Sequence, residues 1–271
     1  DYNTTTANTI AGLAALAASD EVEVVVYDAF TVSSDFSQGG GFSGSVFSNT
    51  AGDNNTNFGR NAGNSITDGS NNVTIGDEAG TAITTGVNNT LMGSNAGDAI
   101  VAGNFNTAIG KSAISADTTR SLSVAVGFKA LFVQNFSTAT NAFNTAVGEN
   151  SGLAMTVGTE NTLLGGRTGL ALTDADYNVA VGKGALQADT LGSRTTAVGY
   201  QALVTQNFTT ATNSNNTAVG YGAGGAVTTG DANTLIGSEA GDALTDGNQN
   251  VAVGYQSLSG EVRGDKNVAV G

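Results

Sequence analysis

A five-residue phrase, Asn-Thr/Val-x-apolar-Gly, recurs thirteen times along the chain and constrains its fold more than any other feature. Successive copies start 17 residues apart, except for two intervals of 21 residues, from Ser123 to Asn144 and from Thr195 to Asn216. Self-similarity at so short a period is typical of stacked structural units that contact only their neighbours. The copies begin at Asn55, Asn72, Asn89, Asn106, Ser123, Asn144, Asn161, Asn178, Thr195, Asn216, Asn233, Asn250 and Asn267.

The phrase itself predicts a short β-strand when its residues are numbered from the Asn as position one. Position two is Thr or Val and position four is apolar in all thirteen copies, and alternation places these two side chains on one face of a strand. Position five is always Gly, which suits a positive φ or a close approach of another backbone. The sequence therefore predicts an all-β fold, a parallel β-solenoid (β-roll) of 17-residue coils with two 21-residue coils.

Positions nine and twelve are correlated, which predicts what fills the interior. Seven copies have Gly at position nine and a large apolar residue at position twelve, whereas five have Ile or Leu at nine and a polar residue at twelve. Because protein interiors are close-packed, the correlation indicates that each coil contributes one large apolar side chain to the interior, here called the plug. The plugs are Ile66, Ile83, Ile100, Met155, Leu172, Val227 and Leu244 at position twelve, and Ile114, Leu131, Leu186, Leu203 and Leu258 at position nine. The polar residues are Asp117, Gln134, Asp189, Gln206 and Glu261.

The order of the coil types gives a 72-residue super-repeat whose fourth coil is extended. Insertions in a solenoid form loops on one face, so the segments 134–143 and 206–215 are predicted to be loops, about 19 Å apart along the stack. We expect these loops to be candidate receptor contacts. Their Phe residues allow two alternatives, an external contact or a lid over their own coil. The candidate residues are Asn135, Phe136, Thr138, Thr140, Asn207, Phe208, Thr210 and Thr212.

Two parts of the chain are distinguished by composition. Residues 1–48 lack the repeat and contain the alternating segment 21–26, which predicts a small β segment or an N-terminal cap, followed by a Gly-rich joint at 38–41. Residues 49–271 are predicted to be the repetitive shaft, with the thirteenth repeat truncated. Since the pattern should continue beyond Gly271, we expect the chain to be part of a longer protein.

The missing residue types argue against catalysis. The 271 residues contain no His and no Cys, which excludes a catalytic triad and the ordinary transition-metal clusters. Glu78, Glu149 and Glu239 occupy equivalent or near-equivalent repeat positions, as expected of solvated turns rather than of a glycosidase pair. The Asp residues at 68 and 77, or at 242 and 246, do not have the spacing of a known calcium loop. We therefore expect no enzyme activity, no cofactor and no metal.

Charge restricts the partners. The net charge is −14 with nine basic residues, which argues against nucleic acid and anionic membranes as partners. No run of 18 apolar residues is present, so no membrane insertion is expected. The recurrent Asn at position one predicts a stacked amide ladder at a corner of the coil. The aromatic residues at position six are expected to be exposed or at a subunit contact, and they are Phe128, Tyr200, Tyr221 and Tyr255.

The segments N-V-A-V-G-Y-Q-S-L at 250–258 and N-T-A-V-G-Y-G-A-G at 216–224 resemble the head repeats of trimeric autotransporter adhesins, the YadA-like left-handed parallel β-roll. The longer repeat, as in T-T-A-V-G-Y-Q-A-L at 195–203, resembles repeats of bacteriophage tail-fibre and other virion-surface proteins. The stretch 18–32 is similar to the end of small β modules that precede such fibres. The resemblance implies a homotrimer of parallel rolls and a role in adhesion.

These observations lead to an expected function. The chain is predicted to be a structural fibre shaft of a virion, a phage tail fibre, that attaches to a host-cell surface glycan or protein and to other virion tail proteins. The alternative is a bacterial cell-surface trimeric adhesin, located outside the cell. An ice-binding β-solenoid would need a ladder of Thr pairs, but position two is Thr in eight coils and Val in five. A polysaccharide-degrading spike would need carboxylates that break the repeat.

Overall fold

The computed structural model describes residues 54–119, 121–136 and 141–271, and these residues form strands and turns without a helix. The small β segment predicted at 1–48 lies outside the described residues. The strands are β1 (Thr56–Phe58), β2 (Val73–Ile75), β3 (Thr90–Met92), β4 (Thr107–Ile109), β5 (Val124–Val126), β6 (Thr145–Val147), β7 (Thr162–Leu164), β8 (Val179–Val181), β9 (Gly192–Ser193), β10 (Thr196–Val198), β11 (Thr212–Asn213), β12 (Thr217–Val219), β13 (Thr234–Ile236), β14 (Val251–Val253) and β15 (Val268–Val270).

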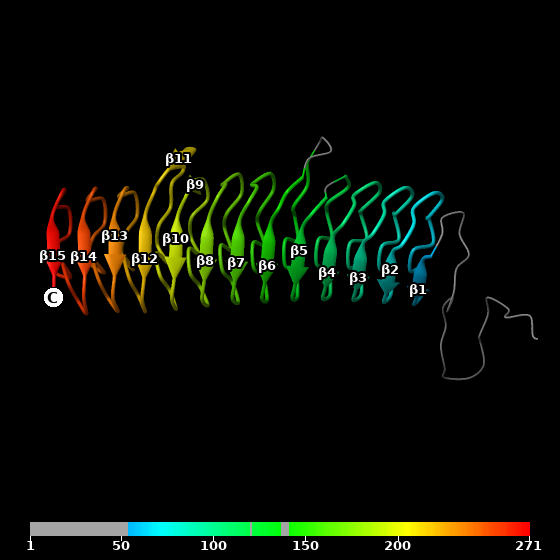
Figure 1. Cartoon of the computed structure of the whole chain (residues 1–271), viewed down its shortest axis with the longest axis horizontal. Coiled ribbons are helices and arrows are strands. Elements are labelled where there is room, and N and C mark those ends of the chain that lie inside the picture. Colours follow the sequence, from blue (N-terminus) through cyan, green and yellow to red (C-terminus); the bar gives the residue numbers. More distant parts are fainter. Residues whose placement is uncertain (1–53, 120, 137–140) are drawn as a thin grey trace, which may run out of the picture. The chain divides into compact units, whose positions relative to one another are not determined.

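One parallel sheet runs along the whole stack (Figure 1). Its 13 strands follow the order β1 to β8, β10, and β12 to β15, so each coil of the chain contributes one strand. Pairing is in register: Thr56 lies opposite Val73 in the next coil, and Thr196 lies opposite Thr217 across the 21-residue coil. The predicted all-β parallel solenoid with 17-residue spacing is therefore confirmed.

Glycine at position five allows the coils to stack at this spacing. Gly76 has a φ of 131°, and a Cβ atom added to it would lie 2.6 Å from the carbonyl carbon of Gly93 in the next coil. A side chain at this position would therefore need both a strained backbone and a displaced neighbour. The Gly residues of successive coils form a column of close backbone contacts, which explains why position five does not vary.

The middle residue of the strands, at position three, points into the coil. In β10, for example, Ala197 is fully buried while Thr196 and Val198 on either side are partly exposed. Positions two and four thus share a face, as alternation requires, and that face is the outer one. The repeat therefore places its small residue inside and its larger branched residues outside.

Each complete coil places one plug in the interior, as the sequence predicted, and three coils bury a second large apolar side chain at position three: Leu91, Leu163 and Leu235. The plugs at positions nine and twelve are buried, except for Leu258 in the last complete coil, which is partly buried against the core. Neighbouring plugs explain the Gly at position nine of the other coils. A Cβ atom on Gly224 would lie 2.7 Å from Leu203 Cδ2 and 2.8 Å from Leu235 Cδ1. A side chain at position nine of this coil would therefore overlap Leu203 of the preceding coil and Leu235 of the next.

Replacing a buried plug should destabilise the solenoid. Leu203→Ala removes a fully buried side chain, and we expect the free energy of unfolding to fall by about 2–5 kcal/mol because a cavity remains. Urea denaturation measures this change. The matched control is Val101→Ala, whose 36% exposed side chain should contribute less than about 0.5 kcal/mol. Equal losses for the two variants would contradict the plug model.

Candidate functional site

A ladder of Asn side chains at position one connects the coils. The Asn72 Nδ2 atom donates to the Gly86 carbonyl at 2.8 Å, and its Oδ1 atom accepts from the backbone N–H of Asn89 at 3.0 Å. The same pair of bonds recurs in Asn233, which donates to Gly247 and accepts from the N–H of Asn250. Each buried amide therefore joins its own coil to the next, and the predicted amide ladder is confirmed.

The ladder is interrupted where the 21-residue coils begin, because Ser123 and Thr195 occupy position one there. A hydroxyl cannot reach as far as an amide, and Gln206 completes the connection. The Gln206 Nε2 atom donates to Thr195 Oγ1 at 3.1 Å, and its Oε1 atom accepts from Asn216 Nδ2 at 2.8 Å. The buried Gln at position twelve thus replaces the missing Asn.

A buried carboxylate fixes this Gln and the loop that follows it. Asp189 accepts hydrogen bonds from Gln206 Nε2 at 2.5 Å and from the backbone N–H groups of Gly192 and Phe208, each at 3.0 Å. The Asp189 side chain is fully buried, and these three donors satisfy its oxygen atoms. The carboxylate therefore connects the third coil of the super-repeat to the extended fourth coil.

The first extended coil contains an equivalent network of buried polar side chains. Gln134 Nε2 donates to Asp117 Oδ2 at 2.9 Å and to Ser123 Oγ at 3.1 Å, and its Oε1 atom accepts from Asn144 Nδ2 at 3.0 Å. The sequence indicated that position twelve is polar in these coils, but it did not reveal that the polar residues are buried and joined. The signal available was the recurrence of Asp, Gln and Ser/Thr at a spacing of 72 residues.

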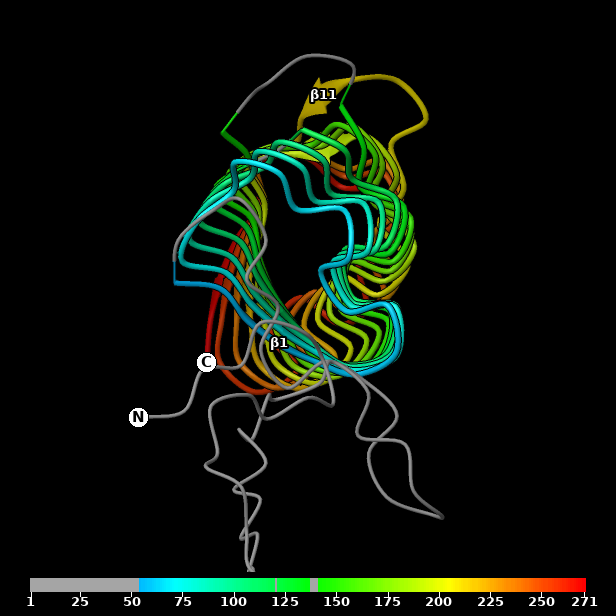
Figure 2. The ribbon, with the colours of Figure 1, turned by 90° about the vertical axis from the view of Figure 1, so that its right-hand side faces the viewer.

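The second extended coil forms a projecting loop, as predicted, whereas residues 137–140 of the first lie outside the described residues. In the second, β11 pairs in parallel with β9, and in the first a single parallel bridge joins Ser121 to Asn141 at the equivalent positions. Figure 2 shows β11 across the coil from β1 and the main sheet. The second loop therefore projects from the side of the solenoid that lies away from the outer face of the sheet.

The structure resolves one alternative for the loop residues. Phe208 is only 6% exposed, and its backbone is held by Asp189 and by Thr190, whose Oγ1 atom donates to the Phe208 carbonyl at 2.8 Å. Phe208 is therefore the lid over its own coil, and its inclusion among outward contact residues is corrected. Asn135 and Thr210 are exposed, and Phe136, Asn207 and Thr212 are half-buried. Thr138 and Thr140 lie outside the described residues.

The carboxylates considered as catalytic or calcium ligands lie in surface ladders. Arg60 donates to Asp77 at 2.7 Å and lies 3.5 Å from Glu78. The hydrogen bond to Asp77 and then its charge raise the pKa of the exposed Arg60 guanidinium, which is already cationic at neutral pH. No group of three or more His, Cys, Asp or Glu is assembled within 54–119, 121–136 and 141–271.

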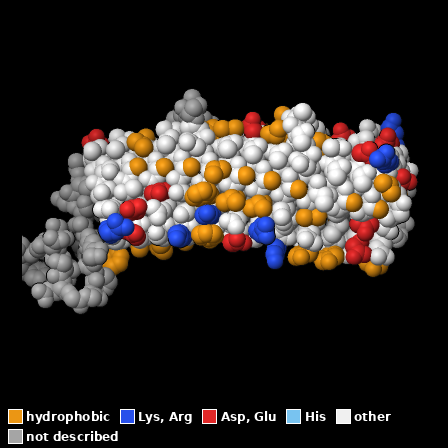
Figure 3. All heavy atoms as spheres, turned by 180° about the vertical axis from the view of Figure 1, so that it is seen from behind, with side chains coloured by type: hydrophobic (Ala, Val, Ile, Leu, Met, Phe, Trp, Pro, Cys, Tyr) orange, Lys and Arg blue, Asp and Glu red, His pale blue; other side chains and the backbone are white. Residues whose placement is uncertain are grey.

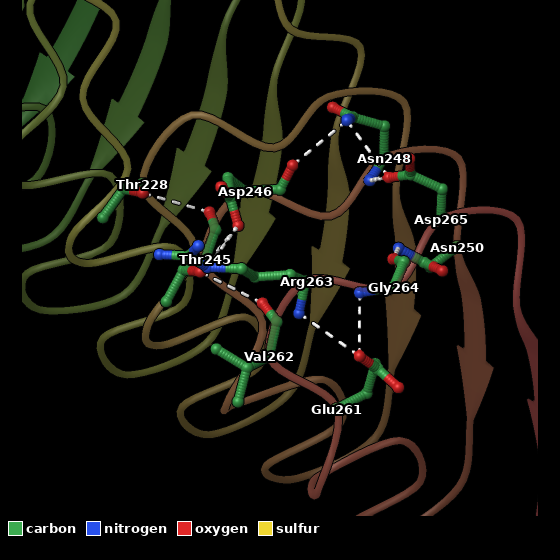
Figure 4. A network of polar contacts seen from close by, with 10 residues as sticks. All are labelled: Thr228, Thr245, Asp246, Asn248, Asn250, Glu261, Val262, Arg263, Gly264 and Asp265. Atoms are coloured by element: carbon green, nitrogen blue, oxygen red, sulfur yellow. Dashed lines mark hydrogen bonds and ion pairs between the residues drawn. The ribbon is translucent and has the colours of Figure 1, made fainter.

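The third super-repeat has a related arrangement near its end (Figure 4). Glu261 occupies the position of Asp189 and accepts from the backbone N–H of Gly264 at 2.8 Å, as Asp189 accepts from Gly192. Nearby, Asp246 lies 3.6 Å from Arg263 at the surface. A carboxylate at position twelve that accepts from the amide three residues later is thus a recurrent feature of the third coil.

The outer face of the sheet is a second candidate surface. It consists of positions two and four of the strands, none of which is charged in any coil. Several of its apolar side chains are exposed by about two fifths, including Met92 and Ile236 at 40% and Val179 at 39%. Contiguous apolar surface of this kind is typical of an interaction site.

Aromatic and charged residues lie beside this face, where the strands end. Tyr200 and Tyr221 stack with ring centroids 5.4 Å apart, and Tyr255 is 67% exposed. The Lys129 Nζ atom lies 5.4 Å from the Phe128 ring centroid. Figure 3 shows hydrophobic and charged side chains interspersed along this lower edge of the solenoid. The prediction that the aromatic residues at position six are exposed is confirmed for this chain.

Comparison with protein-family models, with characterised proteins and with solved structures finds no match. The described residues contain no helix that is long and apolar enough to cross a membrane.

Replacing the buried Asp189 should make the base of the second loop open more often. Asp189→Ala leaves three N–H donors without their acceptor, each worth about 1–3 kcal/mol when buried. We expect the amides of Gly192 and Phe208 to exchange with deuterium at least about tenfold faster, measured by hydrogen exchange. Asp174→Ala, at an exposed Asp in the preceding coil, serves as the control and should leave these rates unchanged. Unchanged rates in Asp189→Ala would contradict the role of the network.

Proposed function

We propose that the chain is the shaft of a homotrimeric virion fibre, a phage tail fibre, which attaches to a host-cell surface through the loops of its two extended coils. The observation that carries this proposal is the exposed, uncharged outer face of the sheet. A chain with a net charge of −14 keeps charge off this face in every coil. Such an arrangement supports association of the face with another apolar surface.

A second copy of the chain is suited to cover the outer face of the sheet. The face repeats at every coil, so a partner that covers all of it must repeat at the same spacing, and another copy does so. Each strand has three residues, so the outer face of the sheet is about 10 Å wide. Three such faces around a common axis enclose a core that the side chains at positions two and four can fill. Closed cyclic symmetry leaves none of the three faces uncovered.

The loops are available for contact in such an assembly. The second loop projects across the coil from the main sheet (Figure 2), so packing the sheets around an axis directs this loop outward. Thr209, Thr210 and Ala211 at the tip of the second loop are exposed, while the Asp189 network holds the base of the loop. A rigid base with an exposed polar tip is suitable for binding a glycan or protein on a cell.

A charge placed on the outer face should prevent association. We expect the purified chain to have the mass of three copies by light scattering across a dilution series. Val219→Lys with Ile236→Lys should give the mass of one copy, because closure would bury the charges. The substitution to Lys reduces the net negative charge, so repulsion between copies is not the cause. Val101→Lys, at position thirteen away from the sheet, is the control and should remain trimeric. A wild-type monomer at all concentrations would overturn the proposal.

The loop tip should determine cell binding. We expect Thr209→Ala with Thr210→Ala to reduce binding of the labelled trimer to a susceptible bacterial strain, measured by flow cytometry over a panel of strains, because these hydroxyls are exposed and free to contact a receptor. Thr228→Ala with Thr229→Ala is the matched control, since both residues are exposed in a coil of ordinary length. Equal binding by the two double variants would remove the second loop from the contact.

A further inference from the structure

The outer face of the sheet does not by itself determine how copies align. Its residues repeat as Thr or Val and as branched apolar residues at every coil, so a shift of one coil, about 4.8 Å, leaves similar residues in contact. Closed symmetry places equivalent coils side by side, and residues that differ between coils determine whether complementary side chains meet there. The inference below rests on the proposed homotrimer and concerns these residues.

Two columns of non-repeating residues flank the face. The leading column is the residue immediately before position one of each coil, and the trailing column is positions six and seven, immediately after the strand. In the middle coils both columns contain large or charged residues. The leading column there contains Phe105, Leu122, Phe143, Glu160, Tyr177 and Arg194. The trailing column there contains Lys111, Phe128, Lys129, Glu149, Arg167, Lys183 and Tyr200.

The leading column holds apolar residues in an unfavourable backbone conformation. Phe105 and Phe143 have φ values of 57° and 50°, in the left-handed region, yet their side chains are 55% and 53% exposed. Asn, which tolerates this region well, occupies the same position in the first three coils. A bulky residue here costs about 1–2 kcal/mol, and the exposed ring recovers little of it within one chain. This indicates a contact with another molecule.

Symmetry determines which columns meet. In a closed ring about an axis parallel to the solenoid, rotation keeps equivalent coils of all copies at the same height. Every strand runs in the same direction around its own coil. The start of the strand in one copy therefore lies beside the end of the strand in the next copy, so the leading column of one meets the trailing column of its neighbour at the same coil.

We propose that these two columns form the contact between neighbouring copies of the trimer, coil against equivalent coil. At this alignment Glu160 faces Arg167 of the neighbouring copy, and no like charges meet. Glu160 and Arg167 have no ion-pair partner among the described residues of their own chain, where the ion pairs involve Arg60 and Arg263. The remaining contacts are one apolar pair, Leu122 with Phe128, one aromatic–carboxylate pair, Phe143 with Glu149, and three cation–aromatic pairs. The cation–aromatic pairs are Phe105 with Lys111, Tyr177 with Lys183, and Arg194 with Tyr200.

Shifted alignments are less favourable for two different reasons. If the neighbour is displaced so that each leading residue meets the preceding coil, Glu160 faces Glu149 and Arg194 faces Lys183, which are like charges. Displacement by one coil in the other direction places Glu160 opposite Lys183. Because these charges attract, charge alone does not exclude this alignment. A constant offset cannot close around a ring, however, because it accumulates into an open helix.

The chain contains no Cys, which permits a direct test by disulfide cross-linking. Glu160→Cys with Arg167→Cys places one thiol in each column. The two positions lie beyond opposite ends of β7 (Thr162–Leu164), and the extended segment 161–165 between them spans about 13 Å, so a disulfide within one chain is not possible. We expect oxidation to give covalent trimers on non-reducing gels, with the light-scattering mass unchanged.

The control is Glu160→Cys with Gln201→Cys, in which the second exposed thiol lies two coils further along the trailing column. It should cross-link at least about tenfold more slowly, because Cα atoms more than about 7 Å apart cannot be bridged without backbone movement. Equal rates in the two variants, or faster reaction in the control, with a trimeric mass would overturn this contact and leave the trimer standing. Absence of cross-links together with a monomeric mass would overturn both.

Discussion

The narrow interior of the coil is the constraint on which the rest of the structure depends. Backbones approach closely at the Gly of position five, and each complete coil has space for one plug, with a second large side chain in only three coils. Positions three and eight must then be filled mainly by Ala, with Leu at position three where neighbouring coils allow it. The remaining branched residues of the strand have no space inside, and they form the uncharged outer face that we propose to be covered by other copies.

The same constraint connects the loops to the core. When the plug is supplied by Leu203 at position nine, position twelve is free to hold a buried polar residue, and Gln206 uses it to bridge the interrupted Asn ladder. Asp189 in the coil before then fixes both the Gln and the start of the loop. An inserted loop thus has a base made of satisfied hydrogen bonds, which lets its tip vary without disturbing the stack.

Local repetition made much of the fold predictable from the sequence. The period, the strand at positions two to four and the single plug all follow from correlations within one chain, and the burial of Ile114 and Met155 agrees with them. The Asn ladder was predictable because identical amides at one position must stack. The inward turn of Phe208 was not, since it depends on a hydrogen bond to Asp189, nineteen residues earlier in the chain and in a neighbouring coil.

The sequence by itself determined that the chain forms stacked parallel coils, because a strict period with a Gly in every copy permits little else. Only the tertiary structure decided which face of the strand is inside. Alternation places Thr196 and Val198 on one side and Ala197 on the other, but it does not say which side is the core. The close stacking at position five and the plugs at positions nine and twelve leave space at position three mainly for Ala, with Leu in three coils. The apolar face is therefore outside, and with it the surface from which we infer the assembly.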